Sequence, residues 1–206
     1  MKPSLFRNSI AILLLISLIW SCNKDECFDI DHLDFYSEEI SKWYVNDSIE
    51  SFTIIDNNGV SQTLQITGRD LHITDKSTYD DCGNSYGSSY YSVSYKTSVS
   101  PISFGVFISG SSFENGFTLR LNYNRRIEPI VGKETVYNFV SRKSLDNVSE
   151  IEYLDNFSVN EYEFSDVLEI TFINTSFENE VKTVYFAKGY GIIKFVTQNG
   201  NEFGIK

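Results

Sequence analysis

The residues that could act as acids or bases near neutral pH are few in this chain. It has two histidines, His32 in an acidic segment and His72 in an alternating, strand-like run. The sequence contains no HExxH motif, nucleophile elbow or phosphate-binding P-loop. A hydrolase would have to use carboxylates such as Glu161 and Glu163, whose i, i+2 spacing places both on one solvated face of a strand. The sequence therefore predicts no catalytic residues, with a carboxylate-based hydrolase as a distant alternative.

The segment Asp80-Asp81-Cys82-Gly83-Asn84 is the only stretch that suggests a metal ion. It combines oxygen ligands with a glycine, as calcium-binding loops do. It lacks the alternate ligand spacing and the distal bidentate glutamate of such loops. A structural turn is the favoured interpretation, and the sequence predicts no metal and no cofactor.

A tyrosine- and serine-rich run offers the best candidate for binding. Tyr86, Tyr90, Tyr91 and Tyr95 alternate with serines and a glycine. Adaptable binding loops have this composition, because tyrosine offers a rigid amphipathic face at low entropic cost. We interpret the four tyrosines as a candidate binding loop for a glycan or a protein. The alternative is an edge strand whose tyrosines cover the sheet.

Charge is unevenly distributed along the chain. The net charge of −11 disfavours nucleic acid as a partner. Basic residues nevertheless gather between positions 120 and 143, and the candidate basic patch comprises Arg120, Arg125, Arg126, Arg142 and Lys143. This patch could meet membrane phosphates or an acidic partner, but neutralisation of the protein's own acidic loops is the simpler interpretation.

The first 21 residues predict an export signal. Lys2 and Arg7 precede the apolar run Ile10–Trp20, which as a helix would span about 16 Å, too little to cross a bilayer. The following Ile19-Trp20-Ser21-Cys22 resembles the bacterial lipobox. The resemblance implies that residues 1–21 are removed and that Cys22 carries acyl chains such as palmitate. Two or more chains would hold the protein at a membrane.

The residues after Cys22 suggest a localisation signal. Asn23-Lys24-Asp25-Glu26 resembles the acidic export tag of Bacteroidetes lipoproteins, which implies the outer face of the outer membrane. The alternative is a solvated acidic tether without an address. We therefore divide the chain into a signal peptide (1–21), a lipidated acidic tether (22–36) and a single β domain (37–206). Since Lys2 and Arg7 are the only charges in the signal, its removal changes the net charge from −11 to −13.

Two cysteines remain besides Cys22. In an oxidising compartment, Cys27 and Cys82 form an even pair and predict one disulfide. This disulfide would tie the tether to the body of the domain.

From residue 49 onward the hydrophobic pattern has a period of two. Alternating runs flank Asn58-Gly59, Asn115-Gly116 and Asn199-Gly200, and an Asn-Gly pair between such runs is a strong hairpin signal. We predict an all-β fold, an antiparallel meander of about ten strands that forms an open barrel, a half-barrel or a two-layer sandwich. One short helix is expected near residues 37–44 and another over residues 132–143, where Val136, Phe139 and Val140 have helical spacing. Residues 75–89 are expected to form a loop.

The end of the chain resembles a known group. The run Lys188-Gly189-Tyr190-Gly191-Ile192-Ile193-Lys194-Phe195, followed by Asn199-Gly200, resembles the last hairpin of small lipid-anchored β proteins of Bacteroidetes. The resemblance implies a β fold and no particular activity.

Together these patterns predict an outer-membrane, surface-exposed lipoprotein that acts as a non-catalytic binding or structural module. Its expected partners are the membrane, through the lipid at Cys22, and a glycan or a surface protein. The alternative is a periplasm-facing carrier of lipid or another apolar ligand, since 16 Phe and 13 Tyr could line a cavity as well as fill a core.

Overall fold

The computed structural model of the chain describes residues 38–73, 78–79, 85–86, 88–98, 102–111, 116–125, 131–139, 141–173, 177–178 and 180–206. Over these residues the fold is all-β, as the sequence predicts. Its elements are α2 (Glu38–Ser41), β1 (Ser51–Asp56), β2 (Ser61–Ile73), β3 (Thr78–Tyr79), β4 (Ser85–Tyr86), β5 (Ser88–Thr97), β6 (Ile102–Ser111), β7 (Gly116–Arg125), β8 (Val131–Asn138), β9 (Lys143–Ser144), β10 (Ser149–Val159), β11 (Tyr162–Phe172), β12 (Val181–Ala187), β13 (Gly191–Thr197) and β14 (Glu202–Ile205).

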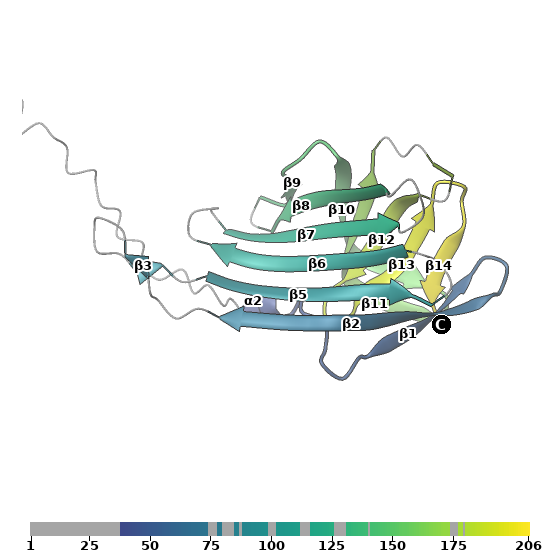
Figure 1. Ribbon diagram of the computed structural model, residues 1–206, viewed down its shortest axis with the longest axis horizontal. Helices are drawn as coiled ribbons and strands as arrows, with labels where there is room; N and C mark the ends of the chain where they lie inside the picture. The colour runs from purple at the N-terminus through teal and green to yellow at the C-terminus, as the bar shows by residue number, and fades with distance from the viewer. Residues whose placement is uncertain are drawn as a thin grey trace, which may run out of the picture.

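Twelve strands form one antiparallel sheet in the order β10-β11-β12-β13-β14-β1-β2-β5-β6-β7-β8-β9, while β3 and β4 form a separate hairpin. The large sheet curls until its two end strands, β9 and β10, contact each other. The result is a nearly closed barrel (Figure 1). This resolves the choice between barrel and sandwich that the sequence leaves open.

The hairpins predicted from Asn-Gly pairs are confirmed. β1 pairs with β2 around Gly59, β6 with β7 ahead of Gly116, and β13 with β14 around Gly200. Gly59 and Gly200 have φ angles of 82° and 83°, the left-handed conformation that glycine adopts without a steric penalty.

The helix predicted over residues 132–143 is wrong. Residues 131–138 form β8, which pairs with β7 along its whole length. Thr135 and Tyr137 both point inward and are buried, as alternate residues of a strand do. Because β8 can pair with a strand on each side, this alternation decides the structure, and the helical spacing of Val136 and Phe139 does not. The N-terminal helix is the single turn α2. Among the described residues, no helix is long and apolar enough to cross a bilayer.

Large side chains fill the interior of the barrel. The largest fully buried aromatic residues come from strands on all sides: Tyr95, Tyr123, Tyr137, Phe186 and Phe195. Trp43, which follows α2, is also buried, and its ring stacks on Phe186 with centroids 6.3 Å apart. The N-terminal segment therefore contributes to the core of the barrel.

The carboxylate of Asp146 joins the two ends of the sheet. It accepts hydrogen bonds from the amides of Val136 (2.6 Å) and Val148 (2.9 Å) and from the hydroxyl of Thr135 (3.0 Å). Burial alone would raise the pKa of Asp146, but these hydrogen bonds outweigh it and hold the pKa below its usual value. A side chain thus bridges the gap where a continuous strand ladder is missing.

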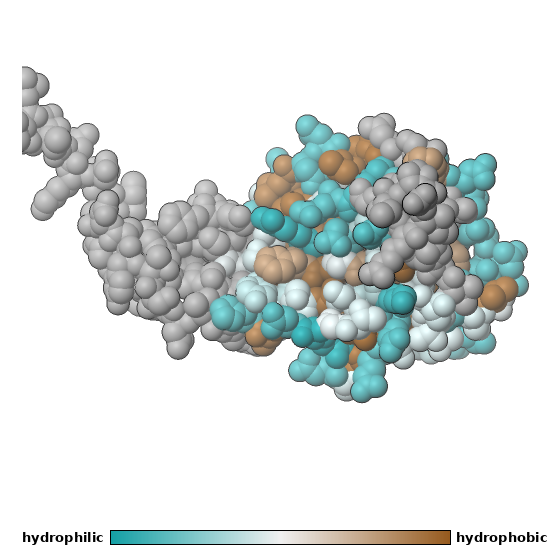
Figure 2. All heavy atoms as spheres, viewed as in Figure 1, coloured by the Kyte–Doolittle hydropathy of each residue, from teal (hydrophilic) through white to brown (hydrophobic). Residues whose placement is uncertain are grey.

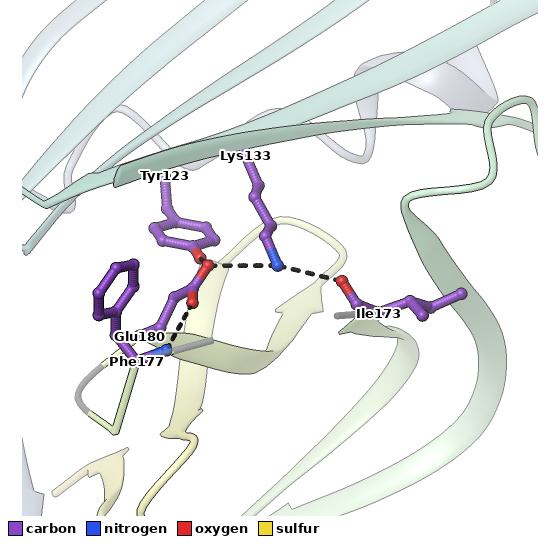
Figure 3. A network of polar contacts seen from close by, with 5 residues as sticks. All are labelled: Tyr123, Lys133, Ile173, Phe177 and Glu180. Carbon is purple, nitrogen blue, oxygen red and sulfur yellow. Dashed lines mark hydrogen bonds and ion pairs between the residues drawn. The ribbon is translucent and has the colours of Figure 1, made fainter. Parts of the chain in front are cut away.

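A buried glutamate ties the segment between β11 and β12 to β7 and β8 (Figure 3). The Glu180 carboxylate accepts a hydrogen bond from Tyr123 (2.8 Å) and pairs with the Lys133 ammonium (3.2 Å), which also donates to the carbonyl of Ile173 (3.0 Å). Burial, and then the bond to Glu180, raises the pKa of Tyr123 well above its usual value. Lys133 belongs to the basic segment of the sequence, and here it neutralises an acid of the same protein.

Substitution of Gly191 by alanine tests how tightly the core is packed at the start of β13. Gly191 has a φ of 87°, and an added Cβ would overlap the hydroxyl of Tyr95 and lie 2.8 Å from a methyl of Val45. Gly200 is the matched control, because it has a φ of 83° but nothing within 4 Å of a Cβ. Both variants carry the backbone cost, about 1 kcal/mol, and Gly191→Ala should lose roughly 2 kcal/mol more by overpacking. Equal losses in urea denaturation would contradict this account.

Candidate functional site

Two adjoining depressions, each enclosing about 540 Å³, follow the segment from Ser41 to Phe52. They adjoin at Ser48, Ile49 and Tyr190, which line both. The remaining lining residues are Ser41, Lys42, Tyr44, Asn46 and Gly189 in one depression and Glu50, Ser51, Phe52, Tyr162, Glu163, Phe164, Ile205 and Lys206 in the other. We call this site the tyrosine groove.

One wall of the tyrosine groove, the segment that follows α2, is attached to the core of the barrel. Trp43 packs at 5.0 Å against Phe139, and the ring of Tyr44 stacks on Tyr91 at 4.5 Å. The amide of Asn46 donates to the carbonyl of Gly189 (3.0 Å). These contacts fix the chain on both sides of residue 45.

Beyond this point the wall is shaped by Arg69. The register of β2 against β5 shifts between Ile66 and Gly68, a β-bulge that puts Arg69 on the inner side of the sheet, opposite Val93. Its guanidinium donates to the carbonyls of Asn46 (3.2 Å), Asp47 (3.2 Å) and Ile49. One planar cation therefore curves residues 46–49 around itself.

The side chain of Asn46 stabilises the same turn. Its Oδ1 accepts hydrogen bonds from the amide (3.0 Å) and the hydroxyl (2.8 Å) of Ser48. This Asx-type turn places Ser48 where the two depressions meet.

Two tyrosine rings of the groove are exposed. Tyr190 is 49% exposed and lies in the turn between β12 and β13, next to Gly189 (φ 76°) and Gly191 (φ 87°). Its ring meets buried Phe164 edge to face at 5.1 Å, which fixes its orientation. Tyr162, at the start of β11, is 42% exposed. The groove thus offers two aromatic surfaces on rigid hairpins.

The polar residues that line the same depression as these rings are Ser48, Ser51, Glu50, Glu163 and Lys206, and Lys42 lines the adjoining one. Glu50 and Glu163 are exposed. An arrangement of aromatic surfaces with a few polar groups is typical of small-ligand sites.

The structure separates Tyr90 from Tyr91 and Tyr95 in the predicted binding loop. Residues 88–97 form β5, a strand of the barrel wall, so the run is not a loop over this length. Tyr91 and Tyr95 face inward and are 3% and 1% exposed, so they belong to the core and cannot contact a ligand at the surface. The side chain of Tyr86, in β4, lies outside the described residues.

Of the three tyrosines whose side chains are described, Tyr90 is the one on the outer face. Its ring stacks between His72 (5.1 Å) and Phe107 (5.2 Å), and its hydroxyl donates to Asp70 (3.0 Å). The ring faces are therefore covered by neighbouring side chains. Figure 2 shows the barrel from this side, where small apolar patches are separated by hydrophilic atoms.

The structure describes the side chains of three members of the predicted basic patch, Arg120, Arg142 and Lys143. Arg120 lies on β7, as a register partner of Phe107 and Val136, while Lys143 lies in β9. Arg142 has its guanidinium 5.0 Å from the ring centroid of Tyr153. The side chain of Arg125 and the whole of Arg126 lie outside the described residues.

The predicted lipidation site Cys22 and the predicted disulfide partners Cys27 and Cys82 also lie outside the described residues, as do the turn at 80–84 and His32. Over the ranges that the structure does describe, no three His, Cys, Asp or Glu side chains are grouped as a metal site.

Sequence reasoning missed the tyrosine groove. Its lining comes from three distant parts of the chain, near residues 41–52, 162–164 and 189–206. The available signal was the Gly189-Tyr190-Gly191 triplet, in which two glycines at left-handed positions present one aromatic side chain.

Comparison of the chain with protein-family models, with curated proteins and with solved structures found no match.

Replacement of Arg69 by methionine tests whether this cation shapes the groove. The change removes the guanidinium from the carbonyls of Asn46, Asp47 and Ile49, of which only that of Asn46 keeps another donor, the amide of Ile49 (3.0 Å). We expect a loss of about 2 kcal/mol in unfolding free energy. The amides of Ser48 and Ile49 should also exchange hydrogen faster. Lys96→Met, on the exposed side of neighbouring β5, is the control and should change neither quantity. Unchanged exchange at residues 48–49 in Arg69→Met would contradict the assigned role.

Proposed function

We propose that this protein is a non-catalytic glycan-binding module of a lipid-anchored, surface-exposed outer-membrane lipoprotein, and that the tyrosine groove is its binding site. The observation that carries the proposal is the pair of exposed rings, Tyr162 and Tyr190, in a groove that also presents hydroxyl and carboxylate groups.

The chemistry of sugars matches this lining. A pyranose ring has C–H groups on its faces, which pack against aromatic rings, and hydroxyls at its rim, which need hydrogen-bond partners. Tyr162 and Tyr190 supply the first kind of contact, since they offer large rigid surfaces at low entropic cost. Ser48, Ser51 and Glu163 supply the second. The size of each depression lies within the usual range for small-molecule sites.

The filled interior supports a surface site over the carrier alternative. Tyr95, Tyr123 and Phe195 are almost completely buried at the centre of the barrel, and Trp43 packs beside them in the same core. A carrier of lipid would need this space to be empty or to open on binding.

The proposed anchor would hold the groove near a membrane. Cys22 lies 16 residues before the first residue of α2, and the groove wall begins three residues later. Sixteen residues span at most about 55 Å, so lipidation of Cys22 would restrict the module to ligands close to the membrane surface.

Alanine substitution of Tyr190 and of Tyr162 tests the site. Retention of the full chain on immobilised cellotetraose, mannotetraose and glucosamine tetramer should weaken by roughly tenfold or more in each variant, because each loses one aromatic face. Tyr90→Ala, on the outer face, should bind like the wild type. A loss confined to Tyr90→Ala would move the site to that face. Cleavage of a tetramer that is lost in Glu163→Gln would replace the proposal by the hydrolase alternative.

The anchor is tested by Cys22→Ala. We expect the wild type, but not this variant, to incorporate labelled palmitate in cells and to fractionate with the outer membrane. Protease treatment of intact cells should remove the wild-type domain. Survival of the domain until the outer membrane is opened would contradict surface exposure.

A further inference from the structure

We infer that the outer wall of the barrel carries a second binding site, a polar depression over Gly105 that takes the oxyanion group of a ligand, such as a sulfate or a carboxylate. This site is separate from the tyrosine groove and does not depend on the proposed function.

The depression lies on β5, β6 and β7, the strands that face the viewer in Figure 1, and it encloses about 330 Å³. This size is near the lower end of the range for small-ligand sites. Register partners on neighbouring strands point to the same face of a sheet, and two rows of such partners supply the lining. The first row is Ser94, Gly105 and Asn122, and the second is Lys96, Ser103 and Asn124.

Gly105 gives the depression its floor. A Cβ at this position would lie 2.7 Å from Oδ1 of Asn122, so the glycine leaves the space in which the Asn122 amide lies across β6. A glycine inside a strand often marks such a close approach of another group.

The lining offers hydrogen-bond donors on both sides of this floor. The ammonium of Lys96, on β5, and the side-chain amides of Asn122 and Asn124, on β7, are exposed. In the described part of the chain, these three groups make no hydrogen bond or ion pair with another residue. They are therefore available to a ligand.

Two hydroxyls of the lining, in contrast, already donate to backbone carbonyls. The hydroxyl of Thr67 donates to Ser94 (3.4 Å), and that of Ser103 donates to Asn124 (3.3 Å). The ammonium and the two amides are consequently the main donors that a ligand would meet.

The charges of this wall favour an anion. Among the lining residues that the structure describes, Lys96 is the one that carries a charge. The nearest carboxylate in register is that of Glu134, which lies opposite Asn122 on β8, and Asp70 and Arg120 both lie in the next row of the outer face. An anion in the depression would thus meet a cation directly and carboxylates only at the border.

An oxyanion suits these donors better than a neutral group does. Its oxygens accept several hydrogen bonds at once, and its bond to an ammonium is charge-assisted. A neutral sugar could use the amides but would gain nothing from the charge of Lys96. The net charge of −11 repels anions at long range, so we expect a dissociation constant on the order of 1 mM.

The test titrates full-length protein in detergent with sodium sulfate and with trigalacturonate, a sugar chain that carries carboxylates, at an ionic strength held constant with sodium chloride. Binding is read by NMR from the side-chain amides of Asn122 and Asn124 and the backbone amide of Gly105. We expect saturable shifts of these signals with an oxyanion and none with neutral cellotetraose. Shifts with sulfate alone would identify a free oxyanion as the ligand, and shifts with trigalacturonate alone an acidic sugar.

Variants of exposed residues test the sign of the charge effect. Lys96→Met should weaken oxyanion binding at least threefold, and Asn122→Asp, which replaces a donor by a carboxylate of the same shape, should abolish it. Glu134→Gln should strengthen binding by about twofold, because it removes a repulsive charge at the border. Lys143→Met, which removes an exposed cation from β9, is the matched control and should change nothing.

Three results would overturn the inference. The first is the absence of saturable shifts with both oxyanions, and the second is an equal response to cellotetraose. The third is binding that Lys96→Met leaves unchanged or that Lys143→Met weakens as much. None of these results bears on the tyrosine groove, whose binding is tested at Tyr162 and Tyr190.

Discussion

The tyrosine groove depends on one guanidinium. Arg69 donates to the carbonyls of residues 46, 47 and 49, and it adds to the backbone hydrogen bond from the amide of Ile49 to the carbonyl of Asn46. Carbonyl oxygens at a bend repel one another unless a donor lies between them, and a planar guanidinium can serve several at once. The bulge near Gly68 is what turns Arg69 inward, so an irregularity in β2 determines the shape of a loop about 20 residues earlier.

The barrel provides the rigidity that this loop needs. A sheet of twelve strands must close on itself or leave exposed edges. Here the closing is done by side chains, with Asp146 bridging β8 to the residues before β10 and Glu180 binding Tyr123 and Lys133. Because both carboxylates are held by several donors, the ends of the sheet stay together without a full ladder. The hairpins that carry Tyr162 and Tyr190 are joined by the pairing of β11 with β12 and by the contact of Phe164 with Tyr190.

Much of the fold could be predicted from the sequence, because strand pairing here is mostly local. Alternation and an Asn-Gly turn were enough to place β1 with β2 and β13 with β14. The same reasoning failed at residues 132–143, where the spacing of the apolar residues is compatible with a helix and with a strand. Pairing with β7 makes this segment a strand. It also could not predict that Tyr91 points into the barrel and Tyr90 out of it, since the register of the whole sheet determines which face of β5 is buried. The groove could not be predicted from the sequence, because Ser48, Tyr162 and Tyr190 come together only through long-range packing.

Hydroxyl-radical footprinting would test the central claim most directly, because it reads every exposed aromatic ring in one experiment. The full chain would be oxidised with and without a mixture of cellotetraose, mannotetraose and glucosamine tetramer, and the modified residues located by mass spectrometry. We predict that the mixture protects Tyr162 and Tyr190 and leaves Tyr90 and Phe177 unchanged. Equal oxidation of Tyr162 and Tyr190 in both samples, or protection of Tyr90 in their place, would contradict the assignment of the groove as the binding site.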